Sequence, residues 1–453
     1  MQAGTAYAAV DGHRQDDFSP HLWRTHDDGA SWTDISAGLP KGSFTTVLRA
    51  DPVRAGLLYA GTDQGVFVSF DDGDHWQPLQ RNLPTAWVRD LLVHGNDLIV
   101  ATQGRAIWVL DDVTPLRQFS AANARAPAHL YTPATAVRVR ANENRDTPLP
   151  PETPLGKNPP AGAVIDYRLA HAANGPVTLE IRDSAGQLVR RFSSADKPAE
   201  LDADRYFARG WLRPGAPLSA SAGAHRFVWN LRYARPQAIQ YGYSISTSWD
   251  SDTPVVPEGP MALPGTYQLV LRVDGKSYRA PLKVVMDPRE TAVTQADLAA
   301  GLAFSQDIGE QLLKVWQNYA QVQAVREQLT ALDGKLGSDA AQRTSVEALL
   351  KQTAPLVSGS GEDSLNLRAI NDGLTDIASD VEGADRAPTD GQRQVVAASK
   401  ARYVKAQALW QQVRDSALPT LNRGLHAAGL ASIRVPALGQ ARQERSEESE
   451  DLP

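Results

Sequence analysis

The side chains of this chain that could do chemistry are carboxylates in loops. Asp16 and Asp17 lie in the segment 11–18, between two stretches of β-type residues, and Asp112 follows the stretch 107–110. Two carboxyl groups about 5 to 9.5 Å apart can cleave a glycosidic bond, one as the acid and one as nucleophile or base. Neighbouring residues of an extended segment face opposite sides, so Asp16 and Asp17 cannot easily form such a pair alone. The competing interpretation is a solvated loop between strands.

Histidines gather near the same loop, at His13, His21 and His26. Their spacing matches no recognised set of metal ligands, so the sequence predicts surface histidines, no metal site and no cofactor. A Gly-x-Ser-x-Gly elbow, a phosphate-binding glycine loop and an HExxH motif are all absent from the sequence. The chain contains no cysteine, which excludes disulfides and thiolate chemistry.

Two octets recur 44 residues apart and indicate a structural role. The pattern Ser/Thr-x-Asp-x-Gly-x-x-Trp occurs at Thr25, Asp27, Gly29 and Trp32, and again at Ser69, Asp71, Gly73 and Trp76. Each octet separates two β-type stretches, so we expect a hairpin turn in which the Asp accepts hydrogen bonds from backbone amides and the Gly has a positive φ. Both Trp side chains are expected to fill the space between neighbouring sheets. The octet is thus interpreted as a structural element that holds neighbouring strands and sheets together.

The interval between the octets is the length of one propeller blade. Residues 1–117 contain three copies of the flanking strands, and the last copy reaches Asp111 and Asp112 without the following Gly and Trp. We therefore predict an incomplete β-propeller of two to three blades. Closed propellers need about four to eight blades, because each blade buries its faces only against its neighbours. We therefore expect this chain to be the C-terminal part of a longer protein.

Three further regions follow. Residues 118–160 are rich in Pro and predict an extended linker. Residues 161–288 contain short alternating strands with turn signals, which are typical of an immunoglobulin-like or fibronectin-like β-sandwich. Residues 289–437 switch to the helical period and predict a helical bundle, and residues 438–453 predict a disordered charged tail. The fold class is thus multidomain.

The octets resemble the Asp-box, or BNR repeat, of sialidase-like, sortilin-type and xyloglucanase-like β-propellers. The order of blades, sandwich and helices resembles bacterial exported proteins described as BNR-repeat glycosyl hydrolases or sortilin-type propeller proteins. In such families the Asp-box lies away from the active centre, which implies no catalytic role for Asp27 or Asp71. The resemblance also implies a periplasmic or extracellular location. A basic segment followed by an apolar one is not found at the N-terminus, so we expect the chain as given to carry no secretory signal.

The favoured function is a non-catalytic module that binds a protein or polysaccharide, with the missing propeller blades as further partners. The alternative is a fragment of a glycoside hydrolase whose carboxylates lie partly in those blades. A formal net charge of −6 argues against nucleic acid as the main partner. No apolar run approaches the roughly 20 residues that span a membrane. Aromatic residues that could stack on sugar rings, although core packing is the competing interpretation, are Trp211, Tyr241, Tyr243 and Trp249.

Overall fold

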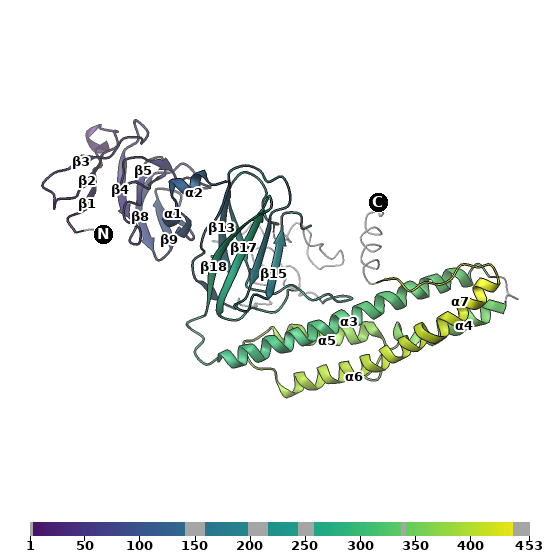
Figure 1. The fold of residues 1–453 in the computed structure, drawn as a ribbon. Helices are drawn as coiled ribbons and strands as arrows, with labels where there is room; N and C mark the ends of the chain where they lie inside the picture. Colours follow the sequence, from purple (N-terminus) through teal and green to yellow (C-terminus); the bar gives the residue numbers. More distant parts are fainter. Residues whose placement is uncertain (1–2, 141–158, 198–215, 243–257, 337–340, 438–453) are drawn as a thin grey trace.

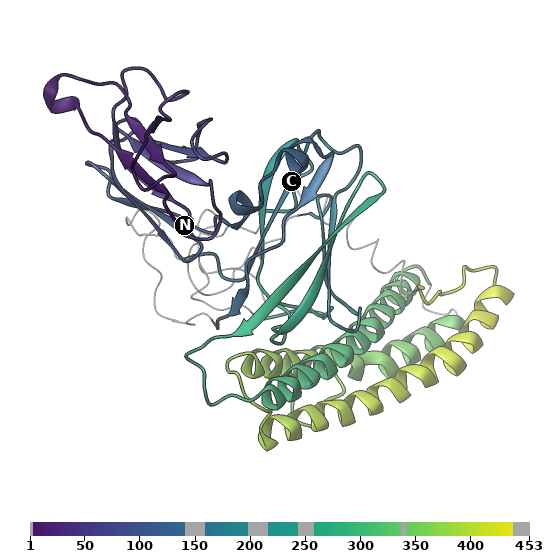
Figure 2. The same ribbon diagram turned by 60° about the vertical axis from the view of Figure 1, so that its left-hand side comes forward.

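A computed structural model describes residues 3–140, 159–197, 216–242, 258–336 and 341–437. The chain forms three successive units, visible from purple to yellow in Figure 1. The three-sheet unit holds β1 to β10, the two-sheet unit holds β11 to β18, and the helical unit holds α3 to α7. Figure 2 shows the same order, with the two-sheet unit between the other two. The protein is therefore multidomain, with β-sheets followed by helices.

The three-sheet unit contains three antiparallel sheets in chain order. Sheet 1 has the order β1-β2-β3, sheet 2 has β4-β5-β6-β7, and sheet 3 has β10-β9-β8. The strands are β1 (Ala6–Ala9), β2 (Leu22–Thr25), β3 (Thr33–Asp34), β4 (Thr45–Ala50), β5 (Leu58–Thr62), β6 (Val66–Ser69), β7 (Gln77–Pro78), β8 (Val88–His94), β9 (Asp97–Thr102) and β10 (Ile107–Leu110).

Three equivalent strand pairs, β1–β2, β5–β6 and β9–β10, repeat in register from sheet to sheet. Tyr59 of β5 pairs with Val68 of β6, and Ile99 of β9 pairs in the same way with Val109 of β10. In sheet 1, Tyr7 of β1 is the counterpart of Tyr59 of β5. Tyr7 is followed by the half-buried Ala8, and Tyr59 is followed in the same way by the buried Ala60. This register assigns each residue of one sheet an equivalent in the next.

The sheets stack on one another, and one core lies between each pair. We call the face of a sheet that points to the preceding sheet its front, and the face that points to the following sheet its back. The back of sheet 1 and the front of sheet 2 share a core with Leu22, Leu58 and Trp76. The back of sheet 2 and the front of sheet 3 share a second core with Tyr59 and Leu98. Both contacts are therefore front on back.

The two-sheet unit contains one sheet with the order β11-β13-β16 and a second with the order β12-β18-β17-β14-β15. Its strands are β11 (Ala128–Leu130), β12 (Ala136–Arg138), β13 (Ala163–Leu169), β14 (Thr178–Arg182), β15 (Leu188–Ser193), β16 (Gly223–Trp229), β17 (Gly265–Val273) and β18 (Lys276–Met286). Residues of both sheets contribute to one core that includes Ile165, Trp229 and Leu271. Alternation along β13, buried at every second residue, explains this packing.

The linker prediction for residues 118–160 is wrong for residues 118–140. Two short helices, α1 (Thr114–Gln118) and α2 (Ala121–Arg125), precede β11, which pairs with β13. β12 pairs with β18 in the parallel direction. These strands have three residues each, too few to show a period in the sequence. Residues 141–158 lie outside the described residues, as does the charged tail 438–453.

The helical unit is built on one long helix. Its elements are α3 (Gln295–Asp333), α4 (Ala341–Thr353), α5 (Leu367–Val381), α6 (Asp390–Gln412), a π-helical turn (Val413–Ala417) and α7 (Leu418–Ala427). Thr294 and Asp297 form a capping box at the start of α3, which satisfies free amides of the first turn. The apolar stripe of α3, including Ile308, Leu312 and Val315, lies in the core of this unit.

Charged side chains join the units. Arg226 on β16 donates to the backbone oxygens of Asp111 and Asp112 and pairs with Asp166 on β13. Asp385, between α5 and α6, pairs with Arg138 at 2.5 Å and is largely buried. Burial raises the pKa of Asp385, but hydrogen bonds from its arginine partners outweigh burial and lower it. At both junctions, therefore, an arginine of the two-sheet unit binds carboxylate or carbonyl oxygens of the neighbouring unit.

Candidate functional site

The two octets form the same hydrogen-bonded turn. Thr25 Oγ1 accepts from the amide of Gly29 at 3.0 Å, and Asp27 Oδ1 accepts from the amide of Ser31 at 2.9 Å. In the second octet Ser69 Oγ accepts from the amide of Gly73 at 2.8 Å, and Asp71 Oδ1 accepts from the amide of residue 75 at 2.9 Å. The two glycines have φ of +89° and +93°, which residues with a Cβ resist. These carboxylates are occupied by the turn itself.

The tryptophans of the two octets differ. Trp76 is 7% exposed, and its indole nitrogen donates to the backbone oxygen of Ile35 in sheet 1 at 2.7 Å. Trp32 is 45% exposed. The prediction that Trp32 fills the space between two sheets is therefore wrong. Among the described residues no sheet precedes sheet 1, so Trp32 has no backbone to pack on, whereas Trp76 has sheet 1.

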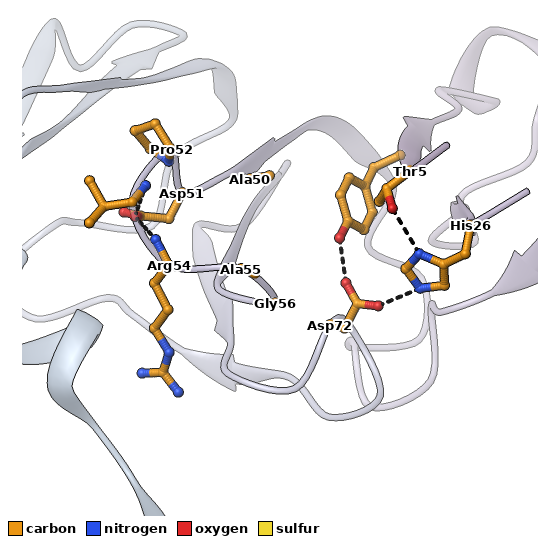
Figure 3. A pocket seen from close by; sticks show the side chains of 11 residues that line it. Thr5, His26, Ala50, Asp51, Pro52, Arg54, Ala55, Gly56 and Asp72 are labelled. Carbon is orange, nitrogen blue, oxygen red and sulfur yellow. Dashed lines mark hydrogen bonds and ion pairs between the residues drawn. The ribbon is translucent and has the colours of Figure 1, made fainter. Parts of the chain in front are cut away.

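We call the end of the three-sheet unit where the two octet turns lie its octet end. A cavity of about 350 Å³ opens there (Figure 3). Its wall carries a chain of hydrogen bonds that begins at Thr5. Thr5 Oγ1 lies 3.0 Å from His26 Nδ1, His26 Nε2 lies 2.8 Å from Asp72 Oδ2, and the Tyr7 hydroxyl donates to Asp72 Oδ1. The opposite wall is the turn 50–56, which includes Arg54. Residues of sheet 1 and sheet 2 therefore meet at this cavity.

A hydroxyl, an imidazole and a carboxylate in this order resemble a nucleophile with its base and orienting group. Other contacts favour a structural role. Arg24 donates to the backbone oxygen of Asp72 at 2.6 Å, and burial together with Asp72 raises the pKa of Tyr7. Asp72 therefore accepts from three side chains of sheet 1 at once. We interpret the cluster as the polar bond between sheets 1 and 2.

The opposite end of the three-sheet unit carries an aromatic cluster, which we call the loop-end cluster and define as His13, Phe18, Phe44, Trp87 and Arg89. The His13 ring stacks on Phe44 at 4.6 Å between centroids, and Trp87 meets Phe44 edge to face at 5.3 Å. The guanidinium of Arg89 lies 4.2 Å from the centre of the Trp87 ring. Phe18 is 48% exposed. The cluster thus presents aromatic surface to solvent.

Polar groups surround this cluster. Asp17 accepts from the amide of Ser19 at 2.9 Å and from His21 Nε2 at 2.7 Å. These hydrogen bonds, that of Ser19 first, lower the pKa of Asp17 to about 2. Asp16 is exposed and follows a single turn of 3-10 helix with φ of +61°. Asp17 is therefore ionised at neutral pH and cannot donate a proton as a general acid.

The three candidate catalytic carboxylates lie at opposite ends of the sheets. Asp16 and Asp17 follow the end of β1, whereas Asp112 follows the end of β10, at the octet end. There the Asp112 carboxylate accepts a hydrogen bond from the backbone amide of Thr114. A strand advances about 3.3 Å per residue, so strands of five or six residues separate the two ends by roughly 15 to 20 Å. That separation exceeds the roughly 9.5 Å of an inverting pair of carboxyls. Asp112 therefore cannot act together with Asp16 or Asp17.

Sequence reasoning missed Phe44, Trp87 and Tyr7. Phe44 immediately precedes β4 and Trp87 immediately precedes β8, so the two occupy equivalent positions of the repeat. Alignment of the first strands of sheets 2 and 3 would have found this signal. The aromatic residue Tyr241 packs against the helical core and donates to the backbone oxygen of Pro236 at 2.6 Å. Trp211, Tyr243 and Trp249 lie outside the described residues.

Among the described residues, no group of three or more His, Cys, Asp or Glu side chains is arranged to hold a metal ion. Of the helices that the structure describes, none combines the length and the apolar character needed to cross a bilayer.

No family model and no curated protein matches the sequence. Among solved structures, the extracellular domain of a hybrid two-component system from B. thetaiotaomicron shares 8% identity at a TM-score of 0.18, over 59% of this chain and 29% of that one. An ancestral GH74 enzyme shares 13% identity at a TM-score of 0.19, over 61% of this chain and 41% of that one. The chain thus spans less than half the length of both structures. Scores this low define no common fold.

Proposed function

We propose that this chain is a non-catalytic binding module that recognises a polysaccharide through the loop-end cluster. In this proposal the three-sheet unit is a partial β-propeller with Asp-box turns, the two-sheet unit is an immunoglobulin-like sandwich, and the helical unit is a supporting bundle. The observation that carries the proposal is the exposed ring of Phe18, which lies with the half-buried ring of Trp87 beside ionised and polar side chains.

The loop-end cluster offers both kinds of contact that a sugar needs. A pyranose ring has an apolar face of C–H groups that packs on an aromatic ring, and hydroxyls at its edge that need hydrogen-bond partners. Phe18 supplies exposed aromatic surface, and Asp17 and His21 supply acceptor and donor groups within the same loop. Arg89 over Trp87 adds a cation at the other side of the cluster. A neutral or acidic polysaccharide fits this combination.

The position of the carboxylates favours binding over hydrolysis. Asp17 is held ionised and Asp112 lies at the other end of the sheets. We therefore expect no turnover of aryl glycosides or xyloglucan by this chain. Turnover that Asp17→Asn or Asp112→Asn abolishes would contradict the proposal and support the glycoside hydrolase alternative instead.

Binding to a glycan microarray, followed by calorimetric titration with the strongest ligand, tests the proposal. Phe18→Ala and Trp87→Ala should each weaken binding by about tenfold or more, equivalent to about 1.4 kcal/mol. Trp32→Ala is the matched control, because Trp32 is a comparably exposed aromatic at the octet end. Equal losses in all three variants, or affinity that none of them changes, would contradict a binding site at the loop-end cluster.

The resemblance to exported Asp-box propellers supports a periplasmic or extracellular location for the protein, where polysaccharides are encountered. Fractionation of cells that express the protein from its own gene tests this location. Recovery in the cytoplasmic fraction alone would contradict it.

A further inference from the structure

The back of sheet 3 is an uncovered apolar surface. Its side chains come from all three strands in one register: Leu92 of β8 faces Ile99 of β9, which faces Val109 of β10, and Ala101 faces Ile107. Ile107 is 70% exposed and Val109 is 51% exposed. None of these residues belongs to a hydrophobic core of the described chain. A row of aliphatic residues on a sheet is the pattern of a face that packs on another sheet.

The equivalent face of sheet 2 shows what covers such a surface. Val66 and Val68 hold the positions of Ile107 and Val109, and they are only 2% and 3% exposed. They are buried because the front of sheet 3 packs on them. The residue types at the two pairs of positions are nearly the same, so the difference in exposure reflects only the presence of a following sheet.

The front of sheet 1 is uncovered in the complementary way. Ala8 and Trp23 are opposite each other on this face and belong to no core of the described residues. Their equivalents in sheet 2, Ala60 and Phe67, pack against sheet 1. Trp32 extends the same face and is exposed, as described above. The three-sheet unit therefore ends in one uncovered front and one uncovered back.

We propose that these two surfaces bind each other between two copies of this chain. Both sheet contacts inside the chain are front on back, and the uncovered pair consists of one face of each kind. Two copies related by a two-fold axis form this contact twice, because the front of each copy then packs on the back of the other. The resulting dimer leaves neither face uncovered, whereas an open arrangement would continue into a fibre. This inference is independent of the glycan site, which lies on the loop-end side of the sheets.

Sedimentation velocity of the full chain over a wide concentration range tests the proposal. The unaltered chain should be dimeric at high concentration. Val109→Lys on the back and Trp23→Lys on the front should each raise the dimer dissociation constant by about a hundredfold or more, because a lysine ammonium would be buried in the contact. Val404→Lys is the control, since Val404 is an exposed valine of α6 in the helical unit and should change nothing.

A mixing experiment separates a lost contact from a misfolded chain. A copy with Val109→Lys keeps its front and a copy with Trp23→Lys keeps its back, so an equimolar mixture should form a heterodimer through the one intact contact. Ile107→Lys provides a second variant of the back that alters an even more exposed side chain. A monomer at every concentration, a dimer that both back variants leave unchanged, or a dimer that Val404→Lys disrupts would each overturn the proposal.

Discussion

The octets at 25–32 and 69–76 have the same pattern and the same turn, but different surroundings. Both turns use the same hydroxyl and carboxylate bonds to the same backbone amides. Only the second octet packs on a neighbouring sheet, where Trp76 and Gly73 contact Ile35. The comparison teaches that the local sequence fixes the turn, whereas the energetic value of its Trp and Gly depends on whether a preceding sheet is present.

Replacement of the two tryptophans should give the largest difference. Trp76→Ala removes a buried side chain and its hydrogen bond to Ile35, and should cost about 3–5 kcal/mol. Trp32→Ala should cost less than about 1 kcal/mol at concentrations where the chain is monomeric. Hydrogen exchange of peptides from β5 and β6 along a urea series measures both values. Similar losses of stability in the two variants would contradict the conclusion that only Trp76 packs on a preceding sheet.

The two glycines should differ less strongly. Both have positive φ, so Gly29→Ala and Gly73→Ala should each cost about 1 kcal/mol from backbone strain. A Cβ on Gly73 would also lie 2.6 Å from Ile35 Cδ1, whereas a Cβ on Gly29 meets nothing closer than 3.8 Å. We expect a further cost of about 1–3 kcal/mol for Gly73→Ala alone. The same exchange experiment decides, and a larger loss for Gly29→Ala would contradict the assignment of the covered octet.

The hydroxyl residues should behave alike, which tests the shared turn. Thr25→Val and Ser69→Ala each leave a glycine amide without its acceptor and should each cost about 1–2 kcal/mol. Thr25→Ser serves as the control, because it keeps the hydroxyl. A cost confined to Ser69→Ala would show that the turn, and not only its surroundings, differs between the copies.

The smallest effect should come from the carboxylates at low pH. Hydrogen bonds from Ser31 lower the pKa of Asp27 to about 2. Partial burial raises the pKa of Asp71, but hydrogen bonds from His75 outweigh it and lower that pKa. A depressed pKa in the folded state gives stability above the ordinary value of 3.8 that disappears as pH falls towards the folded value.

The melting temperature of the three-sheet unit should therefore fall between about pH 5 and pH 2, and less so in Asp27→Asn. Calorimetry at a series of pH values measures this. A melting temperature that rises on acidification through this range would contradict the role of the two carboxylates.

Local patterns were sufficient for the turns and for the long elements. The glycines of the octets predict positive φ, and the apolar stripe of α3 predicts a buried face that includes Ile308 and Leu312. The alternation within residues 161–288 predicts short strands, and β17 is one of the strands that the structure contains there. In each case the determining interactions lie within one segment, so the sequence contains them.

The contacts between distant segments could not be predicted from the sequence. Residues 128–138 have the composition of a linker, yet they form β11 and β12 because β13 and β18 offer free edges. The exposure of Trp32 depends on a neighbour that its own segment does not encode. The loop-end cluster joins Phe18, Phe44 and Trp87 from three separate loops, and only the register of the sheets brings them together.

Thiol labelling tests the central claim, that sheet 2 is covered on its back and sheet 3 is not. The chain has no cysteine, so Val68→Cys and Val109→Cys each carry a single thiol at equivalent positions. In dilute native protein, Val109→Cys should react with a maleimide at least about a hundredfold faster than Val68→Cys, which reacts only on local opening. At high concentration, dimer formation should slow labelling of Val109→Cys. Equal rates in dilute protein, or faster labelling of Val68→Cys, would contradict the account.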